Sequence, residues 1–121
     1  MAYAWIALGS ALGGMARHAV GAWALGLWGP TSPWGTLIVN VVGSLIIGIV
    51  ATTVQANEQM RLFLAVGLCG GFTTFSAFSL QTLNLLQSGA YGAATLNIGL
   101  SVIVCIIAVW AGAQLGTLAS R

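Results

Sequence analysis

The sequence predicts an all-α membrane protein in which four transmembrane helices form one domain over residues 1–121. Composition is the first reason: 59% of the residues are hydrophobic, 3% are charged, and the mean hydropathy is +1.01. A soluble domain carries about 25% charged residues, so this chain could not cover a water-exposed surface. Length is the second reason. One span takes about 20 mostly apolar residues, so four spans leave room only for short loops.

We expect four spans, at residues 4–25, 35–54, 60–86 and 91–118, and three breaks separate them. The first break, residues 28–34, contains both prolines and two tryptophans, a composition typical of a membrane interface. The second, residues 55–59, is the most polar run of the chain, and the third is Gln87–Gly89. The N-terminal segment lacks the basic start of a signal peptide, so we interpret it as the first span.

The charged residues are Arg17, Arg61, Arg121 and Glu58. A net charge of +2 without a basic cluster argues against nucleic acid as a partner, since several phosphates would have to be neutralised. If the N-terminus lies on side one, Arg61 and Arg121 fall on side one and Arg17 on side two. This weak positive-inside bias permits insertion both ways. We therefore expect a dual-topology antiparallel homodimer, with any pathway at the subunit interface.

The third span contains Gly67–Ser79, GLCGGFTTFSAFS. Three glycines followed by two threonines and a serine disfavour an uninterrupted helix. A broken third helix would free backbone carbonyls, each costing several kcal/mol in hydrocarbon unless satisfied, and a bound ion is one way to satisfy them. Carbonyl oxygens suit a hard cation such as sodium, and two antiparallel copies could supply a closed cage. The alternative is a glycine kink with Thr and Ser bonded back to the helix.

Two phenylalanines and a buried amide are the first candidates for an anion pathway. Phe75 and Phe78 are three residues apart on one helical face, and the electropositive edges of their rings could contact a desolvated anion. The alternative is a packed pair in the core. Asn40 is an amide within an apolar run, so it needs hydrogen-bond partners.

Hydroxyl and amide side chains could continue that pathway. Asn97, Ser101 and Cys105 share one face of the fourth span, and they could form a hydrogen-bonding track with the polar residues of the third span: Thr74, Ser76 and Ser79. The alternative is contact between helices, which is the commoner use of such residues in membranes.

Arg17 is the only charged residue well inside a span. Because a charge within a membrane is costly, we interpret Arg17 as a candidate functional residue. It could snorkel to the interface or draw anions into a vestibule. No span contains a carboxylate. Because proton-coupled transport usually needs a titratable acid within the membrane, this absence disfavours that mechanism.

Three motifs resemble the small bacterial fluoride channels, the CrcB family of fluoride-specific ion channels. They are Gly9–His18 (GSALGGMARH), Trp34–Gly43 (WGTLIVNVVG) and Gly67–Ser79, and the resemblance covers essentially the whole chain. It implies a channel, not an enzyme, that exports F⁻ passively from the cytoplasm and gives resistance to fluoride toxicity. It also implies a multi-pass protein of the bacterial plasma (inner) membrane, and a dual-topology homodimer with two antiparallel pores and a structural Na⁺ at the dimer interface.

The resemblance also implies roles for individual residues. Backbone carbonyls of Gly70 and Thr73 from each subunit would hold the Na⁺, and Phe75 and Phe78 would form the aromatic anion site. The other pathway residues would be a hydrogen-bond donor, the lining hydroxyls and the arginine at the end of the first helix: Asn40, Thr74, Ser76, Ser101 and Arg17. Three positions depart from the family pattern. His18 stands where the family often has Tyr, and Asn97 where it sometimes has an aromatic residue. Cys105 stands where a small hydroxyl residue is expected.

Two other function classes remain for comparison. A small multidrug transporter also has four helices and inserts both ways, but it exchanges protons through a membrane-embedded glutamate, whereas Glu58 lies in a polar loop. A non-catalytic membrane assembly factor would use stripes of small residues to pack its helices, such as Gly9 with Gly13 and Gly112 with Gly116. That class gives no reason for a break in the third helix.

Overall fold

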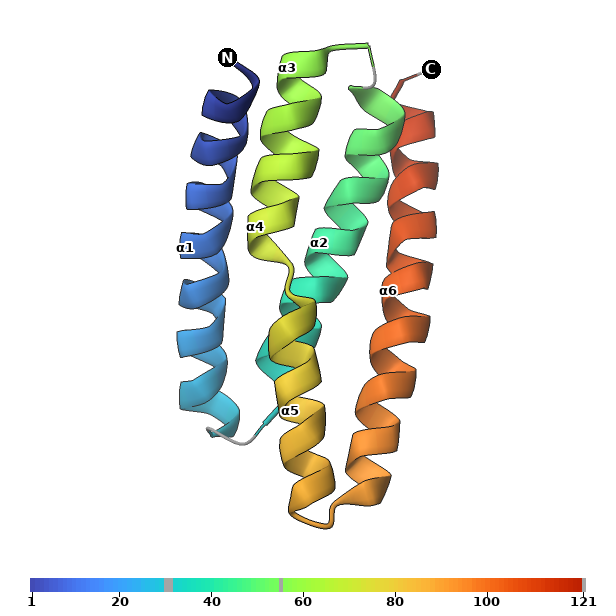
Figure 1. Ribbon diagram of the computed structural model, residues 1–121. Helices are drawn as coiled ribbons and strands as arrows, with labels where there is room; N and C mark the ends of the chain where they lie inside the picture. Colours follow the sequence, from blue (N-terminus) through green and yellow to red (C-terminus); the bar gives the residue numbers. More distant parts are fainter. Residues whose placement is uncertain (30–31, 55, 121) are drawn as a thin grey trace.

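A computed structural model describes residues 1–29, 32–54 and 56–120, which form an all-helical bundle (Figure 1). Three of its four rods are continuous helices: α1 (Ala2–Trp28), α2 (Trp34–Thr53) and α6 (Tyr91–Ala119). The third rod is composite, and its parts in chain order are α3 (Glu58–Arg61), η1 (Leu62–Cys69), α4 (Gly70–Phe72) and α5 (Phe75–Gln87). Successive rods alternate in direction, so the start of α1 and the end of α6 lie at the same end of the bundle as α3. The expectations for Pro30 and Arg121 fall outside the described residues.

Three rods are both long enough and apolar enough to cross a membrane. They are α2 with 20 residues, the third rod with 30 and α6 with 29, with mean hydropathies of 2.1, 1.6 and 2.2. Helix α1 is 27 residues long, which also suffices for a crossing, but glycines, Arg17 and His18 make it more polar. That α1 crosses the membrane as the fourth span stays a prediction.

Small residues bring the rods into backbone contact, as the stripes in the sequence predict. Gly9 and Gly13 of α1 are buried, and a Cβ added to either would overlap backbone atoms of the third rod. Gly48 of α2 and Gly112 of α6 meet in the same way, because a Cβ on either would overlap the other helix's backbone. Close approach of this kind drives helix association in lipid, where no hydrophobic effect acts between helices.

The third rod is broken, and the break lies at Thr73 and Thr74. Both residues are extended, with φ −79°, ψ 155° and φ −149°, ψ 119° respectively. This confirms the broken third helix but corrects its cause. Gly70 has ordinary helical angles, φ −62° and ψ −38°, whereas a Cβ on Gly71 would lie 2.6 Å from the Ser10 carbonyl oxygen. The glycine at 71 therefore allows close packing against α1, and the interruption belongs to the threonines.

The residues before the break form a π-helix, η1, which the sequence analysis did not predict. At its end the Gly70 amide donates to the carbonyls of Ala65 and Gly67, five and three residues earlier. Wider turns of this type occur often at functional sites. In this chain η1 packs along α1 and leads directly into the break.

Neighbouring glycines of α1 allow a matched test of this packing. Gly13→Ala should destabilise the fold by about 1–3 kcal/mol, because the added methyl overpacks the contact with the third rod. Gly14→Ala should be neutral or slightly stabilising, since no atom of the described residues lies within 4 Å of its added Cβ. Equilibrium unfolding in mixed micelles measures both variants. Equal effects of the two substitutions would contradict the packing.

Candidate ion pathway at the break in the third helix

Asn40 of α2 bonds to both backbone groups of Thr74. Its Nδ2 donates to the Thr74 carbonyl at 3.0 Å, and its Oδ1 accepts from the Thr74 amide at 2.8 Å. The carboxamide therefore replaces the acceptor that an unbroken helix would give the Thr74 amide, and it adds a donor to the Thr74 carbonyl. The expectation that this amide needs partners is confirmed. Its partners are the peptide groups of the break.

Thr74 is also the N-cap of α5. Its Oγ1 accepts a hydrogen bond from the Ala77 amide at 3.2 Å and lies 3.2 Å from the Ser76 Oγ. A threonine hydroxyl in this position satisfies an amide that has no partner within the helix. The sequence Thr-Thr-Phe-Ser therefore ends one helix and begins the next within the span of two extended residues.

Arg17 reaches the break from α1. Its Nε donates to the Gly71 carbonyl at 3.2 Å. Gly71 lies at the C-terminal end of α4, where carbonyls lack helical donors and the helix dipole favours a cation. Arg17 thus has a structural partner in addition to any effect of its charge.

The break removes the helical donors of the carbonyls at residues 70–73, and side chains take up two of the displaced amides. In a continuous α-helix the Thr74 amide would donate to Gly70 and the Ala77 amide to Thr73, because each amide bonds four residues back. Here these amides donate instead to Asn40 Oδ1 and Thr74 Oγ1. The Gly70 and Thr73 oxygens, whose helical donors are bonded to side chains, are therefore available to an oxygen-seeking cation. Thr73 Oγ1 also donates to the Cys69 carbonyl, four residues earlier, at 2.8 Å. The hydrogen bond from a threonine back to its own helix, expected as the alternative to an ion site, is therefore present together with the break.

Two hollows meet at Thr74. The first, the groove, has a volume of about 460 Å³ and lies between α2, the third rod and α6; its lining includes Asn40, Gly70, Thr73, Phe75, Phe78 and Ser101. The second, the vestibule, has a volume of about 390 Å³, and its polar lining includes Arg17, Ser32, Thr36 and Gln81. Thr74 lines both hollows. The break therefore separates a vestibule that carries a charge from a mostly apolar groove.

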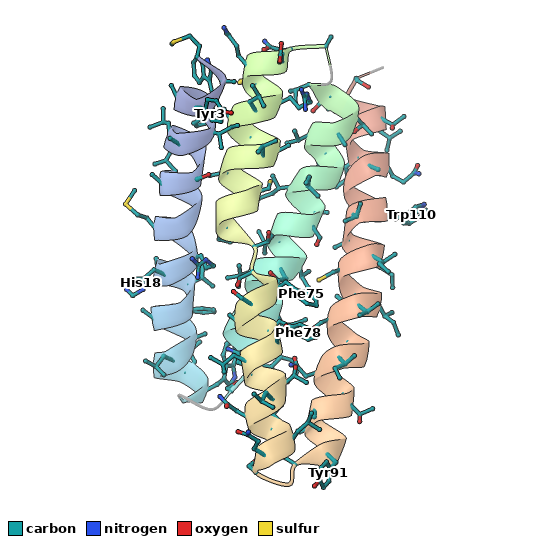
Figure 2. The ribbon with its side chains drawn as sticks, viewed as in Figure 1. Tyr3, His18, Phe75, Phe78, Tyr91 and Trp110 are labelled. Atoms are coloured by element: carbon teal, nitrogen blue, oxygen red, sulfur yellow. The ribbon has the colours of Figure 1, made fainter. Side chains whose placement is uncertain are left out.

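Phe75 and Phe78 project from α5 on the side of α6 (Figure 2). Their ring centroids are 5.4 Å apart and the ring planes are inclined by 51°. Phe78 is 9% exposed, whereas Phe75 is 77% exposed. A packed core pair would bury both rings, so within one chain this alternative describes only Phe78. Phe75 presents its ring to whatever covers the groove.

Comparison with known proteins gives the family. Residues 4–113 match the family described as CrcB-like protein, Camphor Resistance (CrcB). The chain belongs to the CrcB family. CrcB relatives named fluoride-specific ion channel FluC include proteins of Methylocella silvestris, 50% identical over 93% of this chain and 90% of the relative, and of Agrobacterium fabrum, 49% identical over 92% of each. A third, from Paramagnetospirillum magneticum, is 45% identical over 100% of this chain and 99% of the relative.

The polar residues expected on one face of the fourth span of this CrcB protein have two different surroundings. Ser101 and Cys105 line the groove. Asn97 is buried, and its Nδ2 donates to Thr82 Oγ1 at 3.1 Å, while Thr82 donates to the Phe78 carbonyl at 2.8 Å. Asn97 thus makes the contact between helices that was the alternative to a pathway role.

Two polar residues of the expected track lie outside both hollows. Ser76 is exposed and bonds to Thr74, and Ser79 donates its hydroxyl to the Phe75 carbonyl at 2.9 Å. His18 is exposed and is one of the residues that line the vestibule. The structure therefore gathers Arg17, Asn40, Thr74 and the two rings around the break, and leaves Ser76 at its edge.

Gln81 was missed by the sequence reasoning. It lies on α5 and lines the vestibule, and its Oε1 is buried without a hydrogen-bond partner among the described residues. An amide in a mostly apolar span was the signal that selected Asn40. Applied to the third span, the same signal gives two residues, Gln81 and Asn84, and the structure shows that Gln81 lines the vestibule.

The buried Asn97–Thr82 bond can be tested by removing one hydroxyl. Thr82→Val should cost about 1–3 kcal/mol of stability, because it leaves the buried Asn97 donor unpaired. Thr95→Val is the matched control, since the exposed Thr95 hydroxyl bonds only within α6. Unfolding titrations of the purified protein measure both. If Thr82→Val is as mild as the control, the bond does not join α5 to α6.

Proposed function

We propose that this chain is a fluoride-selective ion channel of the bacterial plasma membrane, giving passive export of F⁻ from the cytoplasm and resistance to fluoride toxicity. The observation that carries the proposal is near-full-length identity of 45–50% with relatives named fluoride-specific ion channel. The broken helix between a vestibule and a phenyl-lined groove supports it with a physical path for a small anion.

Passive flow is sufficient for this function. Hydrogen fluoride is a weak acid that crosses membranes as a neutral molecule and dissociates in a neutral cytoplasm. The membrane potential then drives the anion outward with about 2.3 kcal/mol per 100 mV for each charge. The single acid of the chain, Glu58, is exposed in the first turn of α3 at one end of the bundle, where it cannot act as an intramembrane proton carrier. This argues against the small multidrug transporter.

The anion path would run from the vestibule to the groove. Arg17 would raise the local anion concentration in the vestibule, and Thr74 stands where the two hollows meet. Beyond Thr74 the ring edges of Phe75 and Phe78 would contact the dehydrated ion. Asn40 and Ser101 would provide hydrogen bonds along the way, with Ser76 beside Thr74 at the break.

A second, antiparallel copy would complete the groove. Within one chain the polar groups of Asn40, Thr74 and Ser101 lie in a groove between spanning rods, and exposing such groups to lipid is costly. Gly70 is exposed and the ring of Phe75 almost fully so. One four-helix domain per copy, covering residues 1–121, and the weak charge bias between Arg61 and Arg17 fit a dual-topology homodimer.

The same dimer would hold a structural sodium ion. Gly70 and Thr73 carbonyls from two copies would supply four oxygens, the ligand type that a hard cation prefers. These are the carbonyls whose helical donors are diverted to side chains. When bound, Na⁺ would compensate the charge of these oxygens and join the two copies.

Efflux from liposomes tests the proposed function. Vesicles loaded with potassium fluoride and made permeable to K⁺ by valinomycin should release fluoride when the purified protein is present, as read by a fluoride electrode. Release should not require a proton gradient and should far exceed chloride release from matched vesicles. Drug–proton exchange without fluoride release would instead favour the multidrug transporter, and neither activity would favour the assembly factor.

Substitution of the rings tests the path. Phe75→Ile and Phe78→Ile should each lower fluoride flux at least tenfold, a loss of about 1.4 kcal/mol or more, because an aliphatic side chain offers no electropositive edge. Phe63→Ile is the control, since that ring packs edge-on against Trp5, at 6.2 Å, outside the groove. Size-exclusion profiles check assembly. Wild-type flux in both groove variants would remove the rings from the path.

A further inference from the structure

We propose that Asn40 is a positioning residue for the cation site, and that its side-chain oxygen keeps the Gly70 carbonyl free to bind Na⁺. The inference rests on the proposed function, specifically on a sodium ion between two copies of the chain. It adds to Asn40 a role distinct from donating a hydrogen bond to the permeating anion.

Two acceptors compete for one amide at the break. The Thr74 N–H has two candidate acceptors, the Gly70 carbonyl of a continuous helix and Asn40 Oδ1. It bonds to Asn40 Oδ1 at 2.8 Å. If that oxygen were removed, the amide would have no partner at the break, and closing the helix onto Gly70 would satisfy it. The availability of the Gly70 oxygen therefore depends on Asn40.

Asn40 makes two hydrogen bonds at the break. Because Nδ2 also donates to the Thr74 carbonyl at 3.0 Å, the carboxamide holds the two successive peptide units that meet at Thr74. The first of these units joins Thr73 to Thr74, and its carbonyl is that of Thr73, the second expected ligand. One side chain on α2 thus influences both oxygens.

Gly71 contrasts with Gly70 and Thr73. Its carbonyl, the next along the chain from Gly70, accepts from Arg17 Nε at 3.2 Å. The carbonyl of Thr73 is free because Thr74 Oγ1 takes the Ala77 amide. The side chains of Arg17, Asn40 and Thr74 therefore leave the Gly71 carbonyl hydrogen-bonded and the carbonyls of Gly70 and Thr73 available.

A positioning role and a pathway role predict different measurements. Residues that orient metal ligands without touching the metal typically change metal affinity by about 10–100-fold when replaced. A residue that only donates to the anion changes fluoride flux and leaves the sodium requirement as it was. The sodium dependence of protein stability therefore separates the two roles without reference to conduction.

The experiment measures the thermal unfolding midpoint and the dimer fraction of the full chain in detergent. Na⁺ is varied against N-methyl-D-glucamine at constant ionic strength, and fluoride efflux is measured in parallel. Asn40→Ala should raise the Na⁺ concentration for half-maximal stabilisation about tenfold or more. Asn40→Asp keeps an acceptor for the Thr74 amide but loses the donor, so it should keep a near-wild-type Na⁺ midpoint while its flux falls. Thr53→Val, whose hydroxyl bonds within α2, should leave the midpoint unchanged.

A second position keeps the test decisive if Asn40→Ala does not fold. Thr74→Ala should raise the Na⁺ midpoint because the Ala77 amide can then return to the Thr73 carbonyl, and Thr74→Ser should restore it. Reduced flux with an unchanged Na⁺ midpoint in Asn40→Ala, or in Thr74→Ala, would overturn the inference. The inference would also be overturned if Asn40→Asp lost its stabilisation by Na⁺ as completely as Asn40→Ala does.

Failure of the proposed function looks different. A wild-type protein that shows Na⁺-dependent stability but releases no fluoride would contradict the channel and leave the inference standing. A wild-type protein that releases fluoride but is indifferent to Na⁺ would contradict the inference and leave the channel standing.

Discussion

The paired hydrogen bonds between the Asn40 carboxamide and the Thr74 peptide are the interaction on which the rest of the site depends. A bilayer provides no water to satisfy a backbone group, so a helix can break within it only where other groups replace the lost bonds. Asn40 supplies a donor and an acceptor from one side chain. The extended residues at 73 and 74 can exist at membrane depth because of this exchange.

Helix packing places that side chain where it is needed. Glycines bring α1 against the third rod and α2 against α6 until backbones touch, and Arg17 and Asn40 then approach the break from separate helices. The same geometry leaves the vestibule and the groove meeting at Thr74. Small residues therefore control the site indirectly, through the distance between helices.

Much of this arrangement follows from the sequence because the signals are local. Apolar runs separated by polar and proline-containing segments predict the rods, and a lone amide in an apolar run predicts that Asn40 is bonded. The cause assigned to the break was wrong in detail, because Gly71 serves packing and the threonines adopt the extended backbone. The pairing of Asn97 with Thr82, the bond from Arg17 to Gly71 and the π-helix depend on contacts between helices, which no local pattern encodes. Gln81 could have been found as one of two candidates in the third span, together with Asn84, since an amide in an apolar run was the signal that selected Asn40.

The most direct test of the account is a density map of the purified protein in a lipid nanodisc. We expect two oppositely inserted copies, an extended backbone at residues 73–74 in each, and a cation density between the Gly70 and Thr73 carbonyls of the two copies. A third helix that runs without interruption through residues 70–78, or two copies inserted in the same direction, would contradict the account.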